Sequence, residues 1–324
     1  MSRELAVLDP CVAQRSAELH AEFNRRNPFR HVVIENFFAP EFLARLRAEF
    51  PDFTRGDARN EAGELAGKSV VERIRALGPA YKELDDRIQS PEFLRLISQI
   101  TGIPDLLYDP HYFGGGTHEN RRGQDLDPHV DFNRHPETHW HRRLNLIVYL
   151  NPEWDDAWGG ALELHSDPRR EDNRRVTLTP LLNRAVIFET TEWSWHGFAR
   201  IEPPADRPEL TRRSIALYFY TRKRPAEELA DPHSTIYVDH PVPAEWTEPG
   251  RTLSERDARE LRIALTRREQ HIQRLYRDIT QLSRQLENAR GLLGLGAPGS
   301  LARRLYWRVR RLGGRVLRSL GLRR

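Results

Sequence analysis

The sequence predicts a mainly β protein with added helices, in the class of antiparallel sandwiches and barrels to which cupin-like jelly rolls belong. Short runs rich in Val, Ile, Leu and Tyr recur between residues 106 and 224, and turn-forming Gly, Pro and Asp residues separate them. The gaps between these runs hold no long helical pattern. An antiparallel sandwich or barrel is therefore favoured over a parallel sheet, whose strands would need helical crossovers.

The elements follow one another in a clear order. A β-rich run, HVVIENF, occupies residues 31–37, and a helical pattern begins after Ala39-Pro40. We expect helices in this N-terminal part to buttress the β domain, which we delimit as residues 1–224. The main strand candidates are LNLIVYL at 144–150, GALELHS at 160–166, RAVIFET at 184–190 and SIALYFYT at 214–221.

Composition narrows the classes of protein to consider. The chain has 324 residues, 38% of them hydrophobic, which fits a globular protein with a sizeable core. It contains no apolar run long enough to span a membrane, and its start lacks the pattern of a signal peptide. The single cysteine, Cys11, cannot form an internal disulfide, which favours a reducing compartment. We therefore expect a cytoplasmic protein.

The positive net charge comes from one end of the chain. Residues 301–324 contain nine arginines and no acidic residue. Of the 51 basic residues, 42 therefore lie elsewhere, against 47 acidic ones, so the rest of the chain has a net charge of −5. This distribution gives no reason to expect a nucleic-acid-binding main domain.

The composition and periodicity of the sequence change after the β domain. Residues 225–252 are Pro-rich and polar and are interpreted as a linker or strap. Residues 253–290 then show a heptad pattern, preceded by Ser254 and Asp257 at capping-box spacing. The pattern predicts a coiled-coil helix that forms a homodimer through residues 258–289. A single amphipathic helix packed on the main domain would show nearly the same spacing and stays an alternative.

The end of the chain, residues 291–324, is interpreted as a basic amphipathic tail. Its apolar residues recur at steps of three or four between many arginines, which suits the surface of an anionic membrane or an acidic partner. This hypothesis makes the protein peripheral at a membrane, through residues 301–324. A disordered tail and an RNA-binding arm are the alternatives, but neither needs an apolar stripe.

The motif PHVD places His129 two residues before Asp131. On a strand, residues i and i+2 point to the same side, so the imidazole and the carboxylate can bind one metal ion. A second such pair, His165 and Asp167, shows that the spacing alone is weak evidence. Two histidines and a carboxylate are the ligands of non-haem Fe(II) oxygenases, so a third ligand must come from elsewhere in the chain.

The order of the motifs after Asp131 carries a more specific signal. YLN at residues 149–151, GGAL at 159–162, P-x-x-N-R at 180–184, a distal histidine at 196 and R-x-S at 212–214 follow in turn. Together with the lead-in at 28–42, this order resembles the 2-oxoglutarate and Fe(II)-dependent dioxygenases of the prolyl 4-hydroxylase-like superfamily. The resemblance covers most of residues 28–224 and implies a double-stranded β-helix. It leaves the last hundred residues unexplained.

The resemblance implies one set of metal ligands. It assigns iron to His129, Asp131 and His196. His165 falls just after the GGALEL strand, where the family has no ligand, and is interpreted as a turn or rim histidine. His135 is not expected to be a ligand either.

2-Oxoglutarate, the cosubstrate that the resemblance implies, needs a cation inside the barrel. Its distal carboxylate would be costly to bury there without a partner. We expect Arg212 to pair with this carboxylate, because alternation on the last strand places it with Ser214 on the polar face. The R-x-S motif of the family agrees with this choice. Arg213 remains an alternative, because an insert precedes the strand. The resemblance implies that Tyr149 and Tyr112 also contact 2-oxoglutarate.

These assignments predict an Fe(II)- and 2-oxoglutarate-dependent dioxygenase that hydroxylates carbon and releases succinate and CO2. O2 is the other cosubstrate, and ascorbate is the expected reductant. The substrate is open between a prolyl residue, a small molecule and a glycan-linked group, because fold does not decide among them. The alternative function is a non-catalytic cupin-like scaffold that acts through its coiled coil.

Overall fold

Antiparallel strands dominate the first of the two units into which the chain divides, Met1–Pro241 and Val242–Arg324. The computed structural model describes residues 6–25, 27–53, 69–238 and 242–292. Within them, one sheet has the strand order β1-β9-β6-β11-β4-β2, with β3 also paired to β11, and a second has the order β12-β5-β10-β7-β8. The strands are β1 (His31–Ile34), β2 (Ser69–Val71), β3 (Leu107–Tyr108), β4 (Gly116–Asn120), β5 (Leu126–Val130), β6 (His141–Tyr149), β7 (Leu162–His165), β8 (Arg175–Leu178), β9 (Ala185–Glu189), β10 (Trp195–Phe198), β11 (Arg212–Thr221) and β12 (Ile236–Tyr237).

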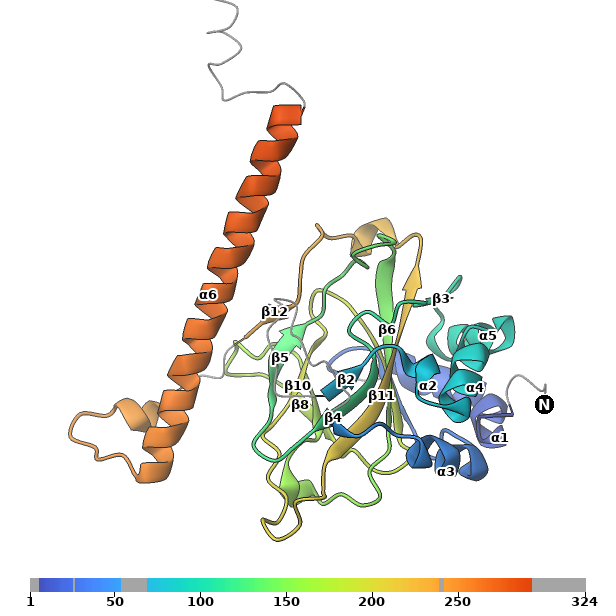
Figure 1. The fold of residues 1–324 in the computed structure, drawn as a ribbon, viewed down its shortest axis with the longest axis horizontal. Coiled ribbons are helices and arrows are strands. Elements are labelled where there is room, and N and C mark those ends of the chain that lie inside the picture. Colours follow the sequence, from blue (N-terminus) through green and yellow to red (C-terminus); the bar gives the residue numbers. More distant parts are fainter. Residues whose placement is uncertain (1–5, 26, 54–68, 239–241, 293–324) are drawn as a thin grey trace, which may run out of the picture. The chain divides into compact units, whose positions relative to one another are not determined.

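The two sheets face each other across a small apolar core. Tyr149 and Phe188 of the first sheet pack there with Leu162 and Leu164 of the second. Every pairing between the described strands is antiparallel, and most neighbours in a sheet are not consecutive in the chain, as in β6, β9 and β11 (Figure 1). The expected jelly-roll class is confirmed.

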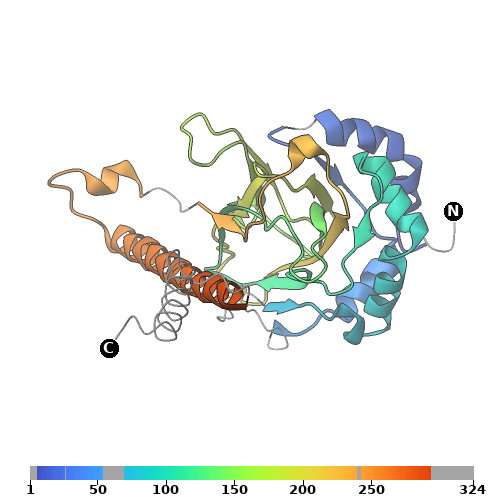
Figure 2. The ribbon, with the colours of Figure 1, turned by 90° about the horizontal axis from the view of Figure 1, so that it is seen from above.

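Helices cover the outer face of the first sheet. They are α1 (Pro10–Gln14), α2 (Ser16–Arg25), α3 (Pro40–Ala48), α4 (Pro79–Ile88) and α5 (Pro91–Thr101). They gather on one side of the sheets (Figures 1 and 2). Their apolar side chains share the largest core with Leu144, Ile215 and Leu217, which point away from the barrel interior. This is the N-terminal buttress that the sequence predicts.

Local signals explain where these helices begin and end. Pro40 opens α3 at its first turn, where a missing N–H costs nothing. Ser90 caps α5 by accepting a hydrogen bond from the backbone N–H of Phe93, and Gly102 ends that helix with a φ of 72°.

Positive φ and close neighbouring atoms explain the paired glycines before β7. Both have positive φ, 66° at Gly159 and 68° at Gly160. A Cβ on Gly159 would lie 2.0 Å from the carbonyl oxygen of Arg200, and one on Gly160 would lie 3.3 Å from Cδ of Arg212. Side chains at these positions would push apart the turn that borders Arg212.

Asn183, within the P-x-x-N-R motif, ties the N-terminal segment to the barrel. Its Oδ1 accepts a hydrogen bond from the backbone N–H of Phe38 at 2.9 Å, and its Nδ2 donates one to the Phe38 carbonyl at 2.9 Å. Asn183 is buried and has a φ of 60°, a conformation that Asn tolerates better than most residues. The motif thus has a structural role, because it holds the N-terminal segment against the barrel.

Asn183→Ala is expected to lower the free energy of unfolding by about 2 to 4 kcal/mol, because it leaves two buried backbone groups unpaired. Urea unfolding followed by circular dichroism measures this. Asn183→Gly removes the same hydrogen bonds but accepts the positive φ, so it should lose somewhat less. A stability of Asn183→Ala equal to that of the wild type would contradict the tether.

After β11 the chain returns along the barrel. Arg224 donates hydrogen bonds to the carbonyls of Arg142 and Thr190, and Asn133 donates to the carbonyl of Asp231. β12 then pairs with β5 at the edge of the second sheet. Part of the segment interpreted as a linker or strap therefore joins the β-structure; the domain boundaries themselves stay predictions.

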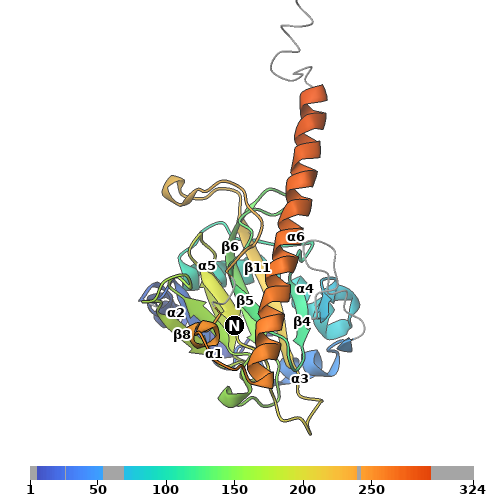
Figure 3. The ribbon, with the colours of Figure 1, turned by 90° about the vertical axis from the view of Figure 1, so that its left-hand side faces the viewer.

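The second unit contains one long helix, α6 (Glu255–Leu292), which runs without a break (Figure 3). The capping box forms as the sequence indicates: Ser254 Oγ accepts from the backbone N–H of Asp257, and the Asp257 carboxylate accepts from that of Ser254. Among the described residues, no helix is both long and apolar enough to cross a membrane. The basic tail at 301–324 lies outside the described residues.

Candidate metal centre

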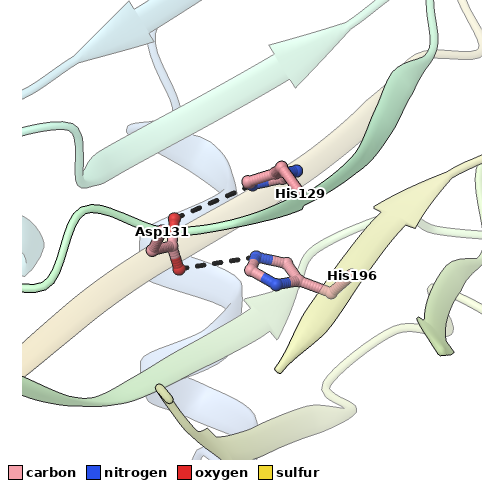
Figure 4. A group of neighbouring side chains, drawn as sticks. All are labelled: His129, Asp131 and His196. Atoms are coloured by element: carbon pink, nitrogen blue, oxygen red, sulfur yellow. Dashed lines mark ion pairs between the residues drawn. The ribbon is translucent and has the colours of Figure 1, made fainter. Parts of the chain in front are cut away.

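Three side chains converge between the sheets: His129 on β5, Asp131 just beyond its end, and His196 on the neighbouring strand β10 (Figure 4). β10 pairs with β5 so that His196 lies directly opposite His129. Asp131 Oδ1 is 3.7 Å from Nε2 of His129, and Oδ2 is 3.5 Å from Nε2 of His196. The three ligand atoms lie within 4.8 Å of one another.

Backbone carbonyls orient both imidazoles. Nδ1 of His129 lies 2.9 Å from the carbonyl oxygen of Asp127, and Nδ1 of His196 lies 2.9 Å from that of Ser194. A proton on each Nδ1 satisfies these contacts and leaves the Nε2 lone pairs directed at Asp131. Burial also lowers the pKa of His196, which favours the neutral ring that a metal needs.

Asp131 is held as a carboxylate by a buried network. Burial by itself would raise its pKa, but the guanidinium of Arg142 and the two nearby histidines hold the pKa well below its usual range. Arg142 Nη2 lies 3.2 Å from Oδ2, and Asn145 Nδ2 donates to the same oxygen at 2.8 Å. The carboxylate is therefore ionised and restricted in rotation before any metal binds.

This donor set fits Fe(II). Two neutral imidazole nitrogens and one carboxylate on one side of a small space leave further coordination positions open. The hydrogen bonds on the far sides of the ligands restrict their orientation, as at metal sites in general. His129, Asp131 and His196 are therefore the residues that would hold the metal.

A bulge in β6 decides which arginine reaches Asp131. Consecutive residues of β11 pair with Leu144 and then with Arg142, so Arg143 is skipped. Strict alternation from Asn145 would point Arg143 inward and Arg142 outward. The skipped residue reverses this, and Arg142 donates to Oδ1 of Asn145 inside the barrel, whereas Arg143 pairs with Glu189.

Arg142 is 1% exposed and lies between the rings of Phe132 and Tyr218, at 4.4 and 3.7 Å from their centroids. Arg142→Met is expected to lower the stability of the metal-free protein by about 3 to 5 kcal/mol, because the Asp131 carboxylate would lose its guanidinium partner. Chemical unfolding in the presence of a chelator measures this loss.

The control for Arg142→Met is Arg170→Met. Arg170 pairs with Asp172, but both side chains are more than 60% exposed. No measurable change is expected there, since exposed ion pairs contribute little. Equal stability of the two variants would contradict the role given to the network around Asp131.

A second buried arginine, Arg212, lies between the sheets. Arg212 is 5% exposed, and no carboxylate among the described residues forms an ion pair with it. Its Nε donates to the Gly160 carbonyl at 2.6 Å and its Nη2 to the Tyr149 hydroxyl at 3.2 Å. Burial lowers the pKa of Arg212, which shows how unfavourable the charge is without an anion.

Arg212 lies close to the metal ligands. Its guanidinium carbon is 4.3 Å from the ring centroid of Phe198, which follows His196 by two residues on β10. Two residues along a strand correspond to roughly 7 Å. A short dicarboxylate could thus reach the guanidinium with one end while its other end lies at the metal.

The neighbours of Arg212 were named from the sequence. Tyr149 is fully buried, and Ser214 pairs with it across β6 and β11. Arg213 points to the other face, where it forms an ion pair with Glu119 and its side chain is 39% exposed. Of the two arginines, the structure brings only Arg212 to the interior between the sheets.

Tyr112 is not part of this group. Gly116 pairs with Ala216 and Tyr108 with Phe219, so Tyr112 lies near the end of β11 opposite to Arg212. Its hydroxyl donates to Asp85 at 2.7 Å. Tyr112 also borders a separate cavity of about 470 Å³, lined by Glu72, Arg73, Ile74, Arg75, Ala76, Asp85, Pro110, His111 and Tyr112.

The histidines not expected to be ligands have other partners. His135 Nε2 lies 3.3 Å from Asp109, and His165 Nε2 lies 3.3 Å from Glu163. The interpretation of His165 as a turn or rim residue was wrong in one respect, because it is the last residue of β7 and only 4% exposed. It pairs with Trp195, so it faces away from His196.

Sequence reasoning missed two residues at the centre. Arg142 could not be predicted from alternation, because the bulge in β6 reverses which side chains point inward. Tyr237 lies on β12 directly opposite His129, with ring centroids 5.2 Å apart. The short apolar run around Tyr237 inside the Pro-rich segment was the available signal for an edge strand.

Comparison with known proteins agrees with this geometry. Residues 115–220 match the family model described as the 2OG-Fe(II) oxygenase superfamily. Over 242 residues the chain is 24% identical to prolyl 3-hydroxylase OGFOD1 of Mus musculus. That match covers 69% of this chain and 39% of the mouse protein.

Solved structures show similar chains at low identity. A prolyl hydroxylase from Trichoplax adhaerens, solved with a peptide of the hypoxia inducible factor oxygen degradation domain, has a TM-score of 0.48 at 15% identity, covering 70% of this chain and 100% of that one. A prolyl-4-hydroxylase from Pseudomonas putida has a TM-score of 0.41 at 17% identity, covering 67% of this chain and 96% of that one.

Proposed function

We propose that this chain is an oxygenase, because residues 115–220 match the family model of the 2OG-Fe(II) oxygenase superfamily. In this proposal the protein hydroxylates a prolyl residue of a protein substrate and releases succinate and CO2. The protein is an oxidoreductase whose cofactors are Fe(II), 2-oxoglutarate and O2. The proposal rests on the convergence of His129, Asp131 and His196 near buried Arg212, which has no carboxylate partner within the part of the chain that the structure describes.

The side chains have separate tasks in this reaction. His129, Asp131 and His196 would hold the metal, and a site with three protein ligands would leave coordination positions for 2-oxoglutarate and O2. Bound iron supplies the oxidising power that removes hydrogen from an unactivated carbon. Arg212 pairs with the distal carboxylate of 2-oxoglutarate, with Tyr149 and Ser214 beside it.

The apolar walls around the site exclude water. Phe188 lies 4.7 Å from the ring of His196, measured between centroids, and Phe198 lies over Arg212. A dry pocket strengthens the pairing of Arg212 with a carboxylate and keeps a reactive site from side reactions.

The prolyl substrate rests on the likeness to the mouse prolyl 3-hydroxylase. The match covers 39% of the mouse protein, so a shared prolyl substrate is part of the proposal. Small molecules and glycan-linked groups are the other outcomes of the test.

The test treats cell extract with the iron-loaded protein and 2-oxoglutarate and searches peptides and small molecules for products heavier by 16 mass units. Succinate is quantified in parallel. Prolyl peptides carrying the added oxygen are expected, and modified small molecules with none among peptides would refute the substrate. A protein that binds iron but forms no succinate with any extract would instead favour the scaffold alternative.

A further inference from the structure

Helix α6 carries a narrow apolar stripe that extends along most of its length. Apolar side chains recur at the first and fourth places of each heptad, written a and d. Those with large exposed surfaces are Leu265, Ile272, Leu275, Ile279, Leu282 and Leu286, each between 45% and 63% exposed in the single chain. Exposing such a row of apolar side chains to water is unfavourable, so we expect another surface to cover the stripe.

The width of the stripe indicates what kind of partner fits. A helix that packs on a globular domain normally adds a third apolar row beside the a and d positions. In α6 the flanking e and g positions between 262 and 285 are mostly polar: Arg262, Ala264, Glu269, His271, Tyr276, Asp278, Ser283 and Gln285. A seam of a and d residues alone is the surface that another helix covers.

We propose that α6 pairs with α6 of a second copy of this chain as a parallel, two-stranded coiled coil. The central a positions hold Ile272 and Ile279, and the central d positions hold Leu275 and Leu282. β-Branched residues at a with Leu at d favour parallel two-stranded assembly. The pattern therefore selects both the number of helices and their direction.

Arg268 fixes the register. It occupies a d position in an otherwise apolar row, and Glu269 follows at e. In a parallel pair the two Arg268 side chains meet in one layer, where Glu269 of the opposite copy borders the hole that receives each of them. In a fully overlapped antiparallel pair, Arg268 would face Ile279 in two separate layers, away from Glu269 of the opposite copy.

The mass of the full chain in solution tests the pairing. Sedimentation equilibrium should give twice the monomer mass of 37.8 kDa. Leu275→Glu with Leu282→Glu should weaken association by about 100-fold or more, since the charges enter the seam. The matched control, Gln270→Glu with Gln281→Glu, adds the same charge outside the seam and should remain a dimer. A monomeric wild type, or a dimer that survives the seam variant, would overturn the proposal.

A charge exchange tests Arg268. Arg268→Glu alone places four acids in one layer and should weaken association by about tenfold or more. Arg268→Glu combined with Glu269→Arg restores opposite charges and should recover the dimer. Failure of the double variant to recover would contradict the assigned layer.

Crosslinking tests the direction of the helices. In a Cys11→Ser background, Leu261→Cys places two thiols opposite each other in a parallel pair, whereas an antiparallel pair sets each against Leu286. Oxidised glutathione should therefore join the two chains through a disulfide. Efficient crosslinking only between Leu261→Cys and Leu286→Cys chains would show the antiparallel arrangement. None of these measurements depends on catalysis, so they stand or fall separately from the proposed reaction.

Discussion

Replacing His196 with alanine is expected to abolish turnover of 2-oxoglutarate and to weaken binding of Fe(II), or of Co(II) as its spectroscopic substitute, by more than about 100-fold. One of three protein ligands is lost, and only His129 and Asp131 would remain to hold the metal. His129→Ala should behave in the same way, because the two imidazoles lie opposite each other on paired strands.

His165→Ala provides the matched control. His165 is also a buried histidine, on the adjacent strand β7, but it faces away from His196 toward Glu163. Its replacement should leave the visible absorption of bound Co(II) unchanged. If His165→Ala loses the metal and His129→Ala keeps it, the assigned ligand set is wrong.

Arg212→Met is expected to weaken 2-oxoglutarate binding by about 100-fold or more while Co(II) affinity stays the same. The guanidinium is buried without a carboxylate partner among the described residues, so the ligand's carboxylate would be its only ionic partner. Losing one side of such a pair costs on the order of 3 to 5 kcal/mol. The change in the Co(II) spectrum on titration with 2-oxoglutarate measures the affinity.

The same substitution should not destabilise the free protein. An unpaired buried cation is unfavourable, so Met at this position should leave the free energy of unfolding unchanged or raise it. Arg142→Met is expected to do the opposite, since Arg142 already has a buried carboxylate partner in Asp131.

Arg213→Met is the control for Arg212→Met. Arg213 is adjacent in sequence but points to the opposite face of β11, where it pairs with Glu119. 2-Oxoglutarate affinity should be unaffected. A loss of affinity in Arg213→Met without one in Arg212→Met would mean that the side chains on this strand are assigned to the wrong faces.

Much of the fold could be predicted from local pattern. The four main strand candidates correspond to β6, β7, β9 and β11, and Ala39-Pro40 correctly indicated the start of α3. Alternation on β11 separated Arg212 from Ile215 and Leu217, which pack against the helices. These predictions succeeded because the period of a strand and the proline preference of a first helical turn depend on neighbours in sequence.

Tyr112 shows where motif order stops being informative. The family resemblance implied its contact with 2-oxoglutarate, but the tyrosine donates to Asp85 instead. Sequence distance does not determine which end of a strand a loop residue reaches. The pairing of Gly116 with Ala216 does.

The sequence by itself determined the strand periodicity, the HxD spacing and the capping box, since each arises within a few residues of chain. Only the tertiary structure decided that His196 lies opposite His129, because that depends on the pairing of β5 with β10. It alone decided that Arg142 rather than Arg143 reaches Asp131, since a bulge is defined by the partner strand and reverses alternation without a mark in the sequence.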